Sequence, residues 1–229
     1  MRLLDIIFSI TLLILLIPIF LLVIAILKFS GEGEVFFLQQ RVGKNRESFS
    51  IIKFATMLKD SPNIGAGTIT ENNDPRILPV GKYLRKTKLN ELPQIINVLR
   101  GEMSFIGPRP HALRDLEGVP ENTQSVISSV RPGISGVASI IFRDEEKILH
   151  SVKDVRVFYD KEIAPYKGAL EVWFVQNRSV VLYFKLCVLT LAAIFGLSPS
   201  RSARLIGNVP QPSAVLNTYL NISRMRNSR

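Results

Sequence analysis

Residues 82–110 hold the side chains of this chain whose types and spacing could do chemistry. The stretch reads KYLRKTKLNELPQIINVLRGEMSFIGPRP, with cations ahead of the acid Glu91 and Arg109 inside a closing Gly-Pro-Arg-Pro turn. Guanidinium groups match phosphate oxygens two at a time, so this stretch is a candidate site for a diphosphate. Glu91 would sit among the cations as a metal ligand or a reactive group. The alternative interpretation is a solvated basic surface helix.

Two helices are expected to present these side chains. Residues 80–88 are predicted to form one helix and residues 91–99 the other. In the second, apolar residues recur at helical spacing and should face a core: Leu92, Ile95, Ile96 and Leu99. Pro93 falls in the first turn, where proline is tolerated, so Asn90 is the expected N-cap. Glu91 would then lie at the end of the helix dipole that favours anions.

An uncharged apolar run from Ile6 to Leu27 is long enough to cross the hydrocarbon core of a bilayer. Pro18 lies in its middle and removes one backbone hydrogen bond, so the helix should kink there. Cations lie on both sides of the run, and the positive-inside tendency would place both ends in the cytoplasm. The sequence therefore predicts a helix, broken at Pro18, that enters the membrane and returns. The alternative is a straight anchor with a tolerated proline.

The composition suits a protein that works at a membrane. Hydrophobic residues make up 47% of the chain and the net charge is +10, a balance that suits anionic lipids and phosphorylated substrates. A nucleic-acid binder is an alternative on charge alone, but the sequence has no reader motif and no interleaving of aromatic and basic residues. The sequence also lacks zinc-ligand spacing, a Walker loop and a G-x-G-x-x-G motif.

The remaining segments predict a small mixed fold. Short strands are expected over 35–38 and 49–57, and an amphipathic helix over 144–159. The apolar segment 180–195 is short for a span, so we expect a helix that lies in the membrane interface or packs on the anchor. The fold class is therefore α/β, rich in helix and membrane-associated, with interfacial amphipathic helices.

Four segments carry a resemblance to a known family: EVFFLQQRVGKN, SIIKFATM, NDPRILPVGKYLRKTKLNELPQIINVLRGEMSFIGPRP and VRPGISG. Together with the proline-broken N-terminal helix, they resemble the bacterial sugar transferase family of monotopic polyprenyl-phosphate phosphoglycosyl transferases. The likeness runs from about Asp5 to Leu191. We therefore expect a re-entrant membrane helix over 1–30 and a catalytic domain with interfacial helices over 31–196. Residues 197–229 contain five arginines and no acid, so they are expected to form a basic flexible tail.

The resemblance implies a membrane enzyme of the glycosyl-1-phosphate transferase type. Such enzymes transfer a sugar-1-phosphate from a UDP-sugar to undecaprenyl phosphate and release UMP, as the first membrane step of surface-glycan or exopolysaccharide synthesis. They require Mg²⁺. A re-entrant helix holds them in the bacterial inner membrane, with the catalytic domain facing the cytoplasm. The implied partners are a UDP-sugar, undecaprenyl phosphate and membrane lipids, with room for a homo-oligomer and without nucleic acid.

The resemblance also assigns roles to single residues. Glu91 matches the metal-binding glutamate of the family motif LDELPQ, and Lys53, Arg85 and Arg109 match the cations of the phosphate site. Position 90 departs from the family, because Asn90 stands where the family has the aspartate that attacks the β-phosphate. An amide is a poor nucleophile and a poor metal ligand.

Three consequences of Asn90 stay open at the level of sequence. Glu91 becomes the nucleophile while another acid takes the metal, or the lipid phosphate attacks directly while Asn90 positions oxygens. In the third case the chain is catalytically impaired and acts as a membrane scaffold or a substrate-trapping variant. Two further departures from the family, Ala55 and Tyr183, are expected where a nucleotide or sugar is read, so the sugar does not carry over.

Overall fold

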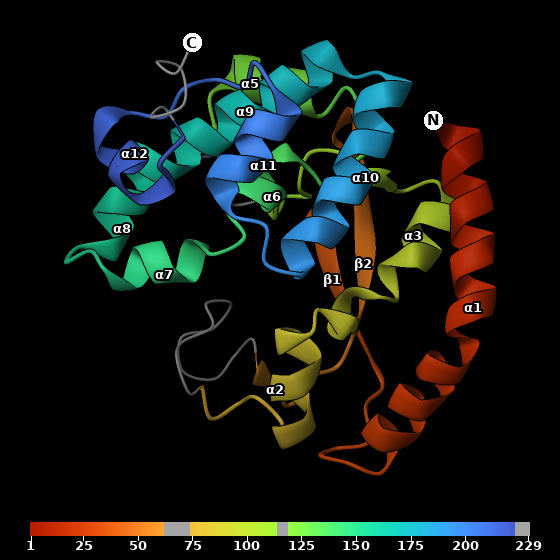
Figure 1. Ribbon diagram of the computed structural model, residues 1–229. Coiled ribbons are helices and arrows are strands. Elements are labelled where there is room, and N and C mark those ends of the chain that lie inside the picture. The colour runs from red at the N-terminus through yellow and green to blue at the C-terminus, as the bar shows by residue number, and fades with distance from the viewer. Residues whose placement is uncertain (62–73, 114–118, 223–229) are drawn as a thin grey trace. The chain divides into compact units, whose positions relative to one another are not determined.

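Two units make up the fold in the computed structural model, which describes residues 1–61, 74–113 and 119–222 (Figure 1). The anchor unit comprises residues 2–41 and 49–103. The carboxyl unit comprises residues 42–48 and 104–229 together with Met1. In the described residues helices dominate, and the strands pair two by two as β1–β2 and β3–β4. The expectation of a helix-rich fold with small sheets is confirmed.

The anchor unit begins with one long apolar helix, α1 (Arg2–Lys28). Among the described residues it is the one helix whose length and composition would let it cross a membrane. The structure does not split it at Pro18, since α1 continues through the proline as a single helix whose axis bends (Figure 1). A proline inside a helix removes one hydrogen bond, and a bend absorbs that loss without ending the helix.

The two sides of α1 differ in what they face. Asp5, Ser9, Val23 and Leu27 are buried in the protein. Large apolar side chains on the remaining surface are more than 60% exposed: Ile14, Leu15, Leu21 and Leu22. In water such a surface would be costly, so α1 has the face of a helix that lies against lipid as well as protein.

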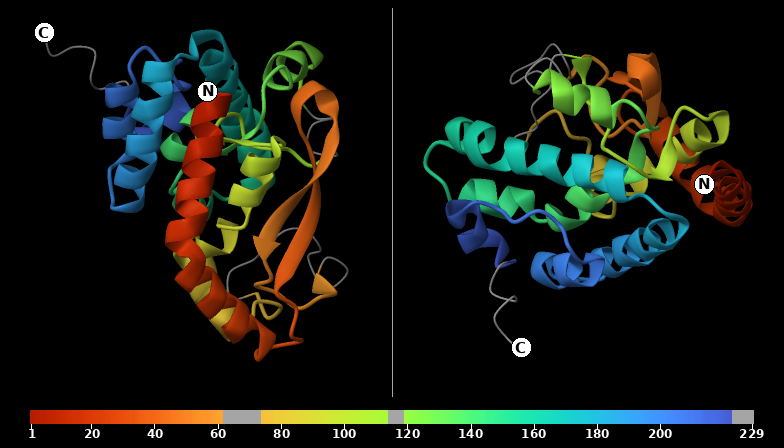
Figure 2. Two further views of the ribbon diagram at one scale, coloured as in Figure 1. Left: turned by 90° about the vertical axis from the view of Figure 1, so that its right-hand side faces the viewer. Right: turned by 90° about the horizontal axis from the view of Figure 1, so that it is seen from above.

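The first turn of α1 is tied to α3 (Gln94–Arg100), which packs beside it (Figure 2). The guanidinium of Arg2 donates to the carbonyl oxygen of Val98 and, at 2.7 Å, to that of Leu99. Carbonyls in the last turn of a helix are short of backbone donors, so a cation there both satisfies them and complements the helix dipole. Arg2 therefore acts as a side-chain cap for the end of α3.

The rest of the anchor unit is a two-stranded sheet and three short helical elements. Strands β1 (Phe36–Val42) and β2 (Ser48–Phe54) pair with each other. The chain continues to α2 (Pro79–Lys86) and to a 3₁₀ turn, η3 (Leu89–Glu91), which precedes α3. The strand expected over 49–57 is thus present in its first part, and Met57 pairs only through an isolated bridge to Ile77.

The expected N-cap role of Asn90 is wrong. Asn90 lies inside η3, and α3 begins only at Gln94. Pro93 has no N–H to bond four residues back, so the chain closes with shorter bonds instead. Leu92 N donates to Leu89 O at 3.1 Å, and Ile95 N donates to Leu92 O at 3.0 Å.

The carboxyl unit is built mainly from helices. Its elements are η1 (Lys44–Arg46), β3 (Ser104–Ile106), α5 (Glu121–Ile127), β4 (Gly133–Ser135), α6 (Val137–Ile141), α7 (Glu145–His150), α8 (Val155–Phe158), η4 (Tyr159–Ile163), α9 (Ala164–Asn177), α10 (Val180–Ile194), α11 (Pro199–Ile206) and α12 (Ala214–Leu220). Helix α9 contacts α5, α6 and η4, and α6 also contacts α10 and α11. Helices α6 and α9 therefore form the centre of this unit.

Two expectations for the carboxyl unit are wrong. The helix expected over 144–159 is interrupted between α7 and α8, where Asp154 starts a new helix by accepting from Val157 N. The flexible tail is also folded as far as residue 222, because α11 and α12 bury apolar side chains such as Ala203, Ile206 and Leu216. The segment is positively charged, but its apolar side chains are spaced so that both helices can pack on the protein. Residues 223–229 of the expected tail lie outside the described part of the chain.

A crossing of two backbone segments lies at the centre of the small parallel sheet. Strand β3 runs parallel to β4, Gly107 N donates to Ser135 O at 2.9 Å, and Gly133 N donates to Pro108 O at 2.8 Å. A Cβ on Gly133 would lie 2.1 Å from Gly107 N, and one on Gly136 would lie 2.3 Å from Gly107 O. Only glycine allows this approach, so the Gly-Pro-Arg-Pro turn is held by the VRPGISG segment.

Replacing Gly133 by Ala should therefore destabilise the protein, because the new methyl group would force two backbones apart. We expect a loss of about 1–3 kcal/mol in the free energy of unfolding, the range for overpacking. Thermal unfolding in detergent micelles measures it. Gly168→Ala in α9 is the matched control, since its Cβ would meet Thr123 at an ordinary 3.6 Å. That control should gain about 0.4–1 kcal/mol. If Gly133→Ala and Gly168→Ala were equally stable, the two backbones would not approach as closely as the structure shows.

Candidate functional site

The structure distributes the predicted site residues over both units. Lys53 lies on β2, Arg85 on α2, and Asn90 with Glu91 on η3, all in the anchor unit. Arg109 lies in the turn that follows β3, in the carboxyl unit. The four side chains of the anchor unit are half-buried, whereas Arg109 is exposed.

One apolar cluster brings together the three segments that carry the anchor-unit residues. Phe54 is 1% exposed and Leu84 is 6% exposed, and both pack with Val23 and Leu27 of α1. Leu89 and Leu92 pack against the same cluster. Each of the four site residues is thus the sequence neighbour of a cluster member: Lys53 of Phe54, Arg85 of Leu84, Asn90 of Leu89 and Glu91 of Leu92.

Helix α2 is fixed closely against the chain that leaves β2. Leu78 N donates to Thr56 O at 3.0 Å, and a Cβ on Gly81 would lie 2.2 Å from the same carbonyl oxygen. The helix that carries Arg85 therefore packs directly on the segment three residues beyond Lys53. Glycine is required at position 81 for this contact.

A left-handed residue turns the chain from α2 into η3. Lys88 has φ +59°, its N–H donates to Arg85 O at 3.1 Å, and its carbonyl accepts from Glu91 N at 3.1 Å. A residue with a Cβ in this conformation costs roughly 1–2 kcal/mol. Strain of this kind is often retained at functional sites, where the surrounding contacts impose it. The turn sets Arg85 and Glu91 on consecutive elements.

The oxygens of the 90–91 pair are suited to a divalent cation. Asn90 Oδ1 is buried and has no hydrogen-bond partner among the described residues. Glu91 adds a carboxylate one residue later. Mg²⁺ takes oxygen ligands and is commonly held by one or two carboxylates together with substrate phosphates, so Glu91 fits it, and Asn90 Oδ1 could add only a weaker, neutral oxygen ligand. No cluster of three or more acidic, histidine or cysteine side chains occurs in the part of the chain that the structure describes.

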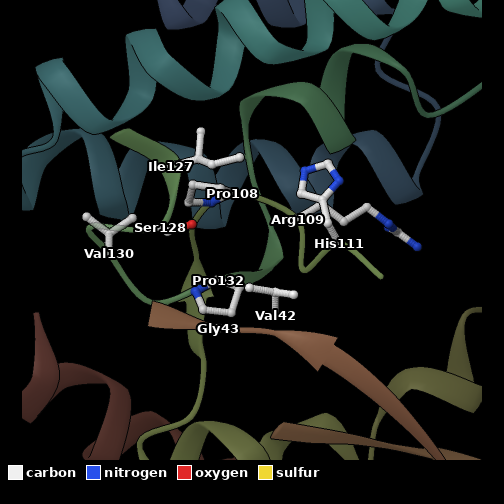
Figure 3. A pocket seen from close by; sticks show the side chains of 9 residues that line it. All are labelled: Val42, Gly43, Pro108, Arg109, His111, Ile127, Ser128, Val130 and Pro132. Atoms are coloured by element: carbon white, nitrogen blue, oxygen red, sulfur yellow. The ribbon is translucent and has the colours of Figure 1, made fainter. Parts of the chain in front are cut away.

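The Arg109 turn borders a shallow pocket in the carboxyl unit (Figure 3). Arg109 and His111 lie on one side of it, and apolar side chains including Ile127 and Val130 lie on the other. The backbone is fixed on both flanks of Arg109: Val42 N donates to His111 O at 2.9 Å, in addition to the glycine crossing described above. The exposed guanidinium is therefore carried by a rigid turn.

Glu171 is a residue near this turn that sequence reasoning missed. It lies on α9, is 4% exposed, and accepts from the backbone N–H of Arg109 at 3.3 Å. Its Oε2 has no partner among the described residues. Burial raises the pKa of Glu171 to about 8, although the Arg109 hydrogen bond and the charges of Lys167 and Arg109 act in the opposite direction. The available signal was an acid inside the apolar run ALEVWFV.

Two residues expected to face a substrate are in the core. Ala55 is 6% exposed and Tyr183 is fully buried on α10. The expectation that these departures from the family lie where a nucleotide or sugar is read is therefore wrong for both positions. Their side chains fill space between elements, and neither surface is available to a ligand.

Known proteins resemble the chain over most of its length. Residues 1–196 match the family model described as Bacterial sugar transferase. The undecaprenyl-phosphate glucose phosphotransferase of Komagataeibacter xylinus is 36% identical over 177 residues, which cover 75% of this chain and 33% of that protein. The exopolysaccharide production protein ExoY of Sinorhizobium fredii is 36% identical over 155 residues, which cover 62% of this chain and 68% of that protein.

The name of a third relative specifies a different sugar. The UDP-N-acetylgalactosamine-undecaprenyl-phosphate N-acetylgalactosaminephosphotransferase of Aeromonas hydrophila is 40% identical over 126 residues, which cover 54% of this chain and 30% of that protein. The chain thus spans about a third of the length of the two named phosphotransferases.

The raised pKa of Glu171 predicts a stability that falls with pH. Between the ordinary pKa of a glutamate, 4.5, and about 8, the unfolded chain releases this proton while the folded chain keeps it. Stability then falls by at most about 1.4 kcal/mol per pH unit across that window. Glu171→Gln cannot ionise and should remove this part of the pH dependence.

Thermal unfolding at pH 5, 6, 7 and 8 tests this, with the midpoint of E171Q rising relative to wild type at each step. Glu121→Gln is the control, because Glu121 is an exposed acid of the same unit paired with Arg46. If the difference in unfolding midpoint between E171Q and wild type stayed constant from pH 5 to pH 8, Glu171 would be ionised in the folded protein.

Proposed function

Because the chain belongs to the bacterial sugar transferase family, we propose that it transfers a sugar-1-phosphate from a UDP-sugar to undecaprenyl phosphate and releases UMP. The product would feed surface-glycan or exopolysaccharide synthesis. Relatives whose names state this class of reaction support the proposal. Because those names differ in the sugar, glucose and N-acetylgalactosamine are the first two donors to test.

The observation that carries the proposal is the apolar cluster of the anchor unit. It brings together, near the end of α1, the three segments of the chain that carry Lys53, Arg85 and the Asn90–Glu91 pair. Cations with an acid at a lipid-anchored position suit a reaction in which both substrates carry phosphate and one is held in the bilayer. A basic surface helix without a ligand would not require such convergence.

The charged residues have separate roles in this reaction. Lys53 and Arg85 neutralise phosphate oxygens of the substrates, and the guanidinium fork of Arg85 also fixes their orientation. Arg109 is proposed as the phosphate-binding cation of the carboxyl unit. Transfer of a phosphoryl group is catalysed mainly by positioning and charge neutralisation, so these roles account for most of the expected rate enhancement.

Mg²⁺ is proposed as the cofactor, held by Glu91 with Asn90 Oδ1 as a second oxygen donor. When bound, it would neutralise charge on the diphosphate. The buried Oδ1 atom without a partner is the support for the contribution of Asn90.

Asn90 cannot attack phosphorus, so two routes are open to the remaining groups. In the direct route an oxygen of undecaprenyl phosphate attacks the β-phosphorus of the UDP-sugar. The bond from that phosphorus to the bridging oxygen breaks, and UMP leaves with the bridging oxygen. In the covalent route a carboxylate oxygen of Glu91 makes the first bond, UMP leaves, and the lipid phosphate then displaces Glu91.

The anchor is proposed to be re-entrant in the bacterial inner membrane, with the catalytic residues on the cytoplasmic face. The support is that both ends of α1 contact the same unit. Arg2 at its start bonds the end of α3, while Val23 and Leu27 near its end join the cluster with Phe54 and Leu84. A helix that spans the bilayer would carry one of these ends to the opposite face.

Helix α10 is proposed to lie in the membrane interface. Exposed apolar side chains at helical spacing form a stripe along it: Val181, Phe184, Val188 and Leu191. These residues recur every three or four positions, so they share one face of the helix. An apolar stripe of this kind is stabilised by contact with lipid.

Glu91→Gln should abolish turnover, because it removes the one carboxylate of the pair. We expect a loss of at least about 10²-fold in kcat, the range for removing a single preorganised charged group. UMP release is measured with membrane-embedded protein, undecaprenyl phosphate and a panel of UDP-sugars. Asn90→Asp should restore the family's acid pair, so its rate should rise or a phospho-sugar adduct should become trappable by mass spectrometry.

The exposed acid Glu121 provides the matched control, and Glu121→Gln should keep the wild-type rate. An adduct on Glu91 in the wild type would establish the covalent route. If E91Q were fully active and N90D indistinguishable from wild type, the Asn90–Glu91 pair would not hold the chemistry. The absence of UMP release with every UDP-sugar would refute the proposed reaction.

The re-entrant topology predicts that both ends of α1 are protected from outside. Leu3 is 70% exposed, so Leu3→Cys and Ser30→Cys can each be labelled without touching Arg2. In sealed cells an impermeant external thiol reagent should label neither position. Pro18→Leu straightens the helix and should raise labelling at position 3. Reaction of position 3 in the otherwise wild-type chain would mean that α1 spans the membrane.

A further inference from the structure

Asn97 is a fully buried polar residue in the middle of α3, and its amide is almost saturated with hydrogen bonds. Its Oδ1 accepts from Ile52 N at 3.0 Å. Its Nδ2 donates to Ser50 O at 2.8 Å and to a carboxylate oxygen of Glu102 at 2.7 Å. A buried amide that makes three bonds is well satisfied, since its side chain offers two donors and one acceptor oxygen.

The two backbone groups that Asn97 binds lie on one edge of β2. In a strand, backbone groups two residues apart point to the same side, as Ser50 O and Ile52 N do. Strand β2 pairs with β1, and no other strand pairs with it in the described residues. The amide of Asn97 therefore takes the place that the peptide group of a neighbouring strand would fill.

This contact joins β2, which carries Lys53, to the helix that follows the Asn90–Glu91 pair. Lys53 directly follows Ile52 on β2, and Glu91 lies three residues before the start of α3. Apolar packing is non-directional, so the cluster around Phe54 would tolerate small shifts of the strand along the helix. The two hydrogen bonds from Asn97 to β2 have defined directions and do not tolerate such shifts. Asn97 therefore fixes the register between these two segments.

We propose that Asn97 is a positioning residue for the phosphate-transfer reaction, and that its amide sets Lys53 at the correct place relative to Glu91. The proposal rests on the function proposed above. A displacement of about 1 Å between reacting groups can cost about 10²-fold in rate, even when substrate is still bound. Loss of the Asn97 bonds should therefore lower kcat more than it raises KM.

The test compares two neighbouring buried residues of α3. Asn97→Asp keeps the size and the acceptor but loses both donors, and it points a second oxygen at Ser50 O and Glu102. Val98→Ala removes packing at an equally buried position and leaves every Asn97 bond in place. We expect kcat per folded N97D enzyme to fall about 10–100-fold. V98A should lower the unfolding midpoint but keep kcat within about twofold, since the bonds from Asn97 to β2 are intact in this variant.

A rescue variant separates positioning from general damage. In the double variant N97D/E102Q, the amide introduced at position 102 donates to the carboxylate introduced at position 97. One of the two lost contacts then returns, and a repulsion between two carboxylates disappears. The double variant should recover at least about fivefold in kcat over N97D, whereas E102Q alone should match wild type. If V98A and N97D lost kcat equally at matched unfolding midpoints, or if N97D/E102Q recovered no activity over N97D, Asn97 would be a structural residue only.

Hydrogen exchange provides a readout that does not need turnover. The Ile52 amide should exchange as slowly as the amides of α3 in the wild-type protein, because it opens only when the helix leaves the strand. Rapid exchange at Ile52 would overturn the proposal even if N97D failed to fold. If wild type released no UMP from any UDP-sugar while Ile52 stayed protected, the proposed function would fail and the Asn97 contact would stand.

Discussion

The apolar cluster at the end of α1 is the constraint on which the rest of the anchor unit depends. Val23, Leu27, Phe54 and Leu84 are each buried to within a few per cent, and each such side chain contributes about 1.5–3 kcal/mol when removed from water. The same contacts that hold the apolar helix α1 also hold the segments that carry Lys53, Arg85 and the 90–91 pair. The position of α1 and the positions of the segments that carry the candidate site residues therefore depend on the same buried side chains.

Hydrogen bonds fix the orientation and register of the packed segments, which non-directional apolar contacts do not. The amide of Asn97 holds α3 to the edge of β2, and Arg2 closes the end of α3 with its guanidinium. In the carboxyl unit the crossing of Gly107 with Gly133 fixes the turn that carries Arg109. Each of these contacts restricts how far the backbone can shift, because a hydrogen bond or a close backbone approach has a defined geometry.

The carboxyl unit shows how burial changes the chemistry of a side chain. Glu171 receives one backbone N–H from Arg109, yet the surrounding protein raises its pKa to about 8, so it is mainly neutral at physiological pH. A neutral acid beneath the Arg109 turn can accept the backbone N–H without adding a negative charge beside a cation proposed to bind phosphate. Burial therefore lets the residue hold the turn without competing for the cation.

Sequence alone determined the apolar anchor, the candidate charged residues and the Pro/Gly turns, because these depend on composition and on local backbone rules. It missed the 3₁₀ turn at Asn90, the break between α7 and α8, and the packed helices α11 and α12. Those outcomes depend on a missing proline N–H and on apolar partners distant in the chain. Only the tertiary structure packed the neighbours of Lys53, Arg85 and Glu91 into one cluster and placed the acid Glu171 against the backbone of Arg109. Burial and contacts between segments 30 to 60 residues apart are set by packing of the whole chain, and no local pattern encodes them.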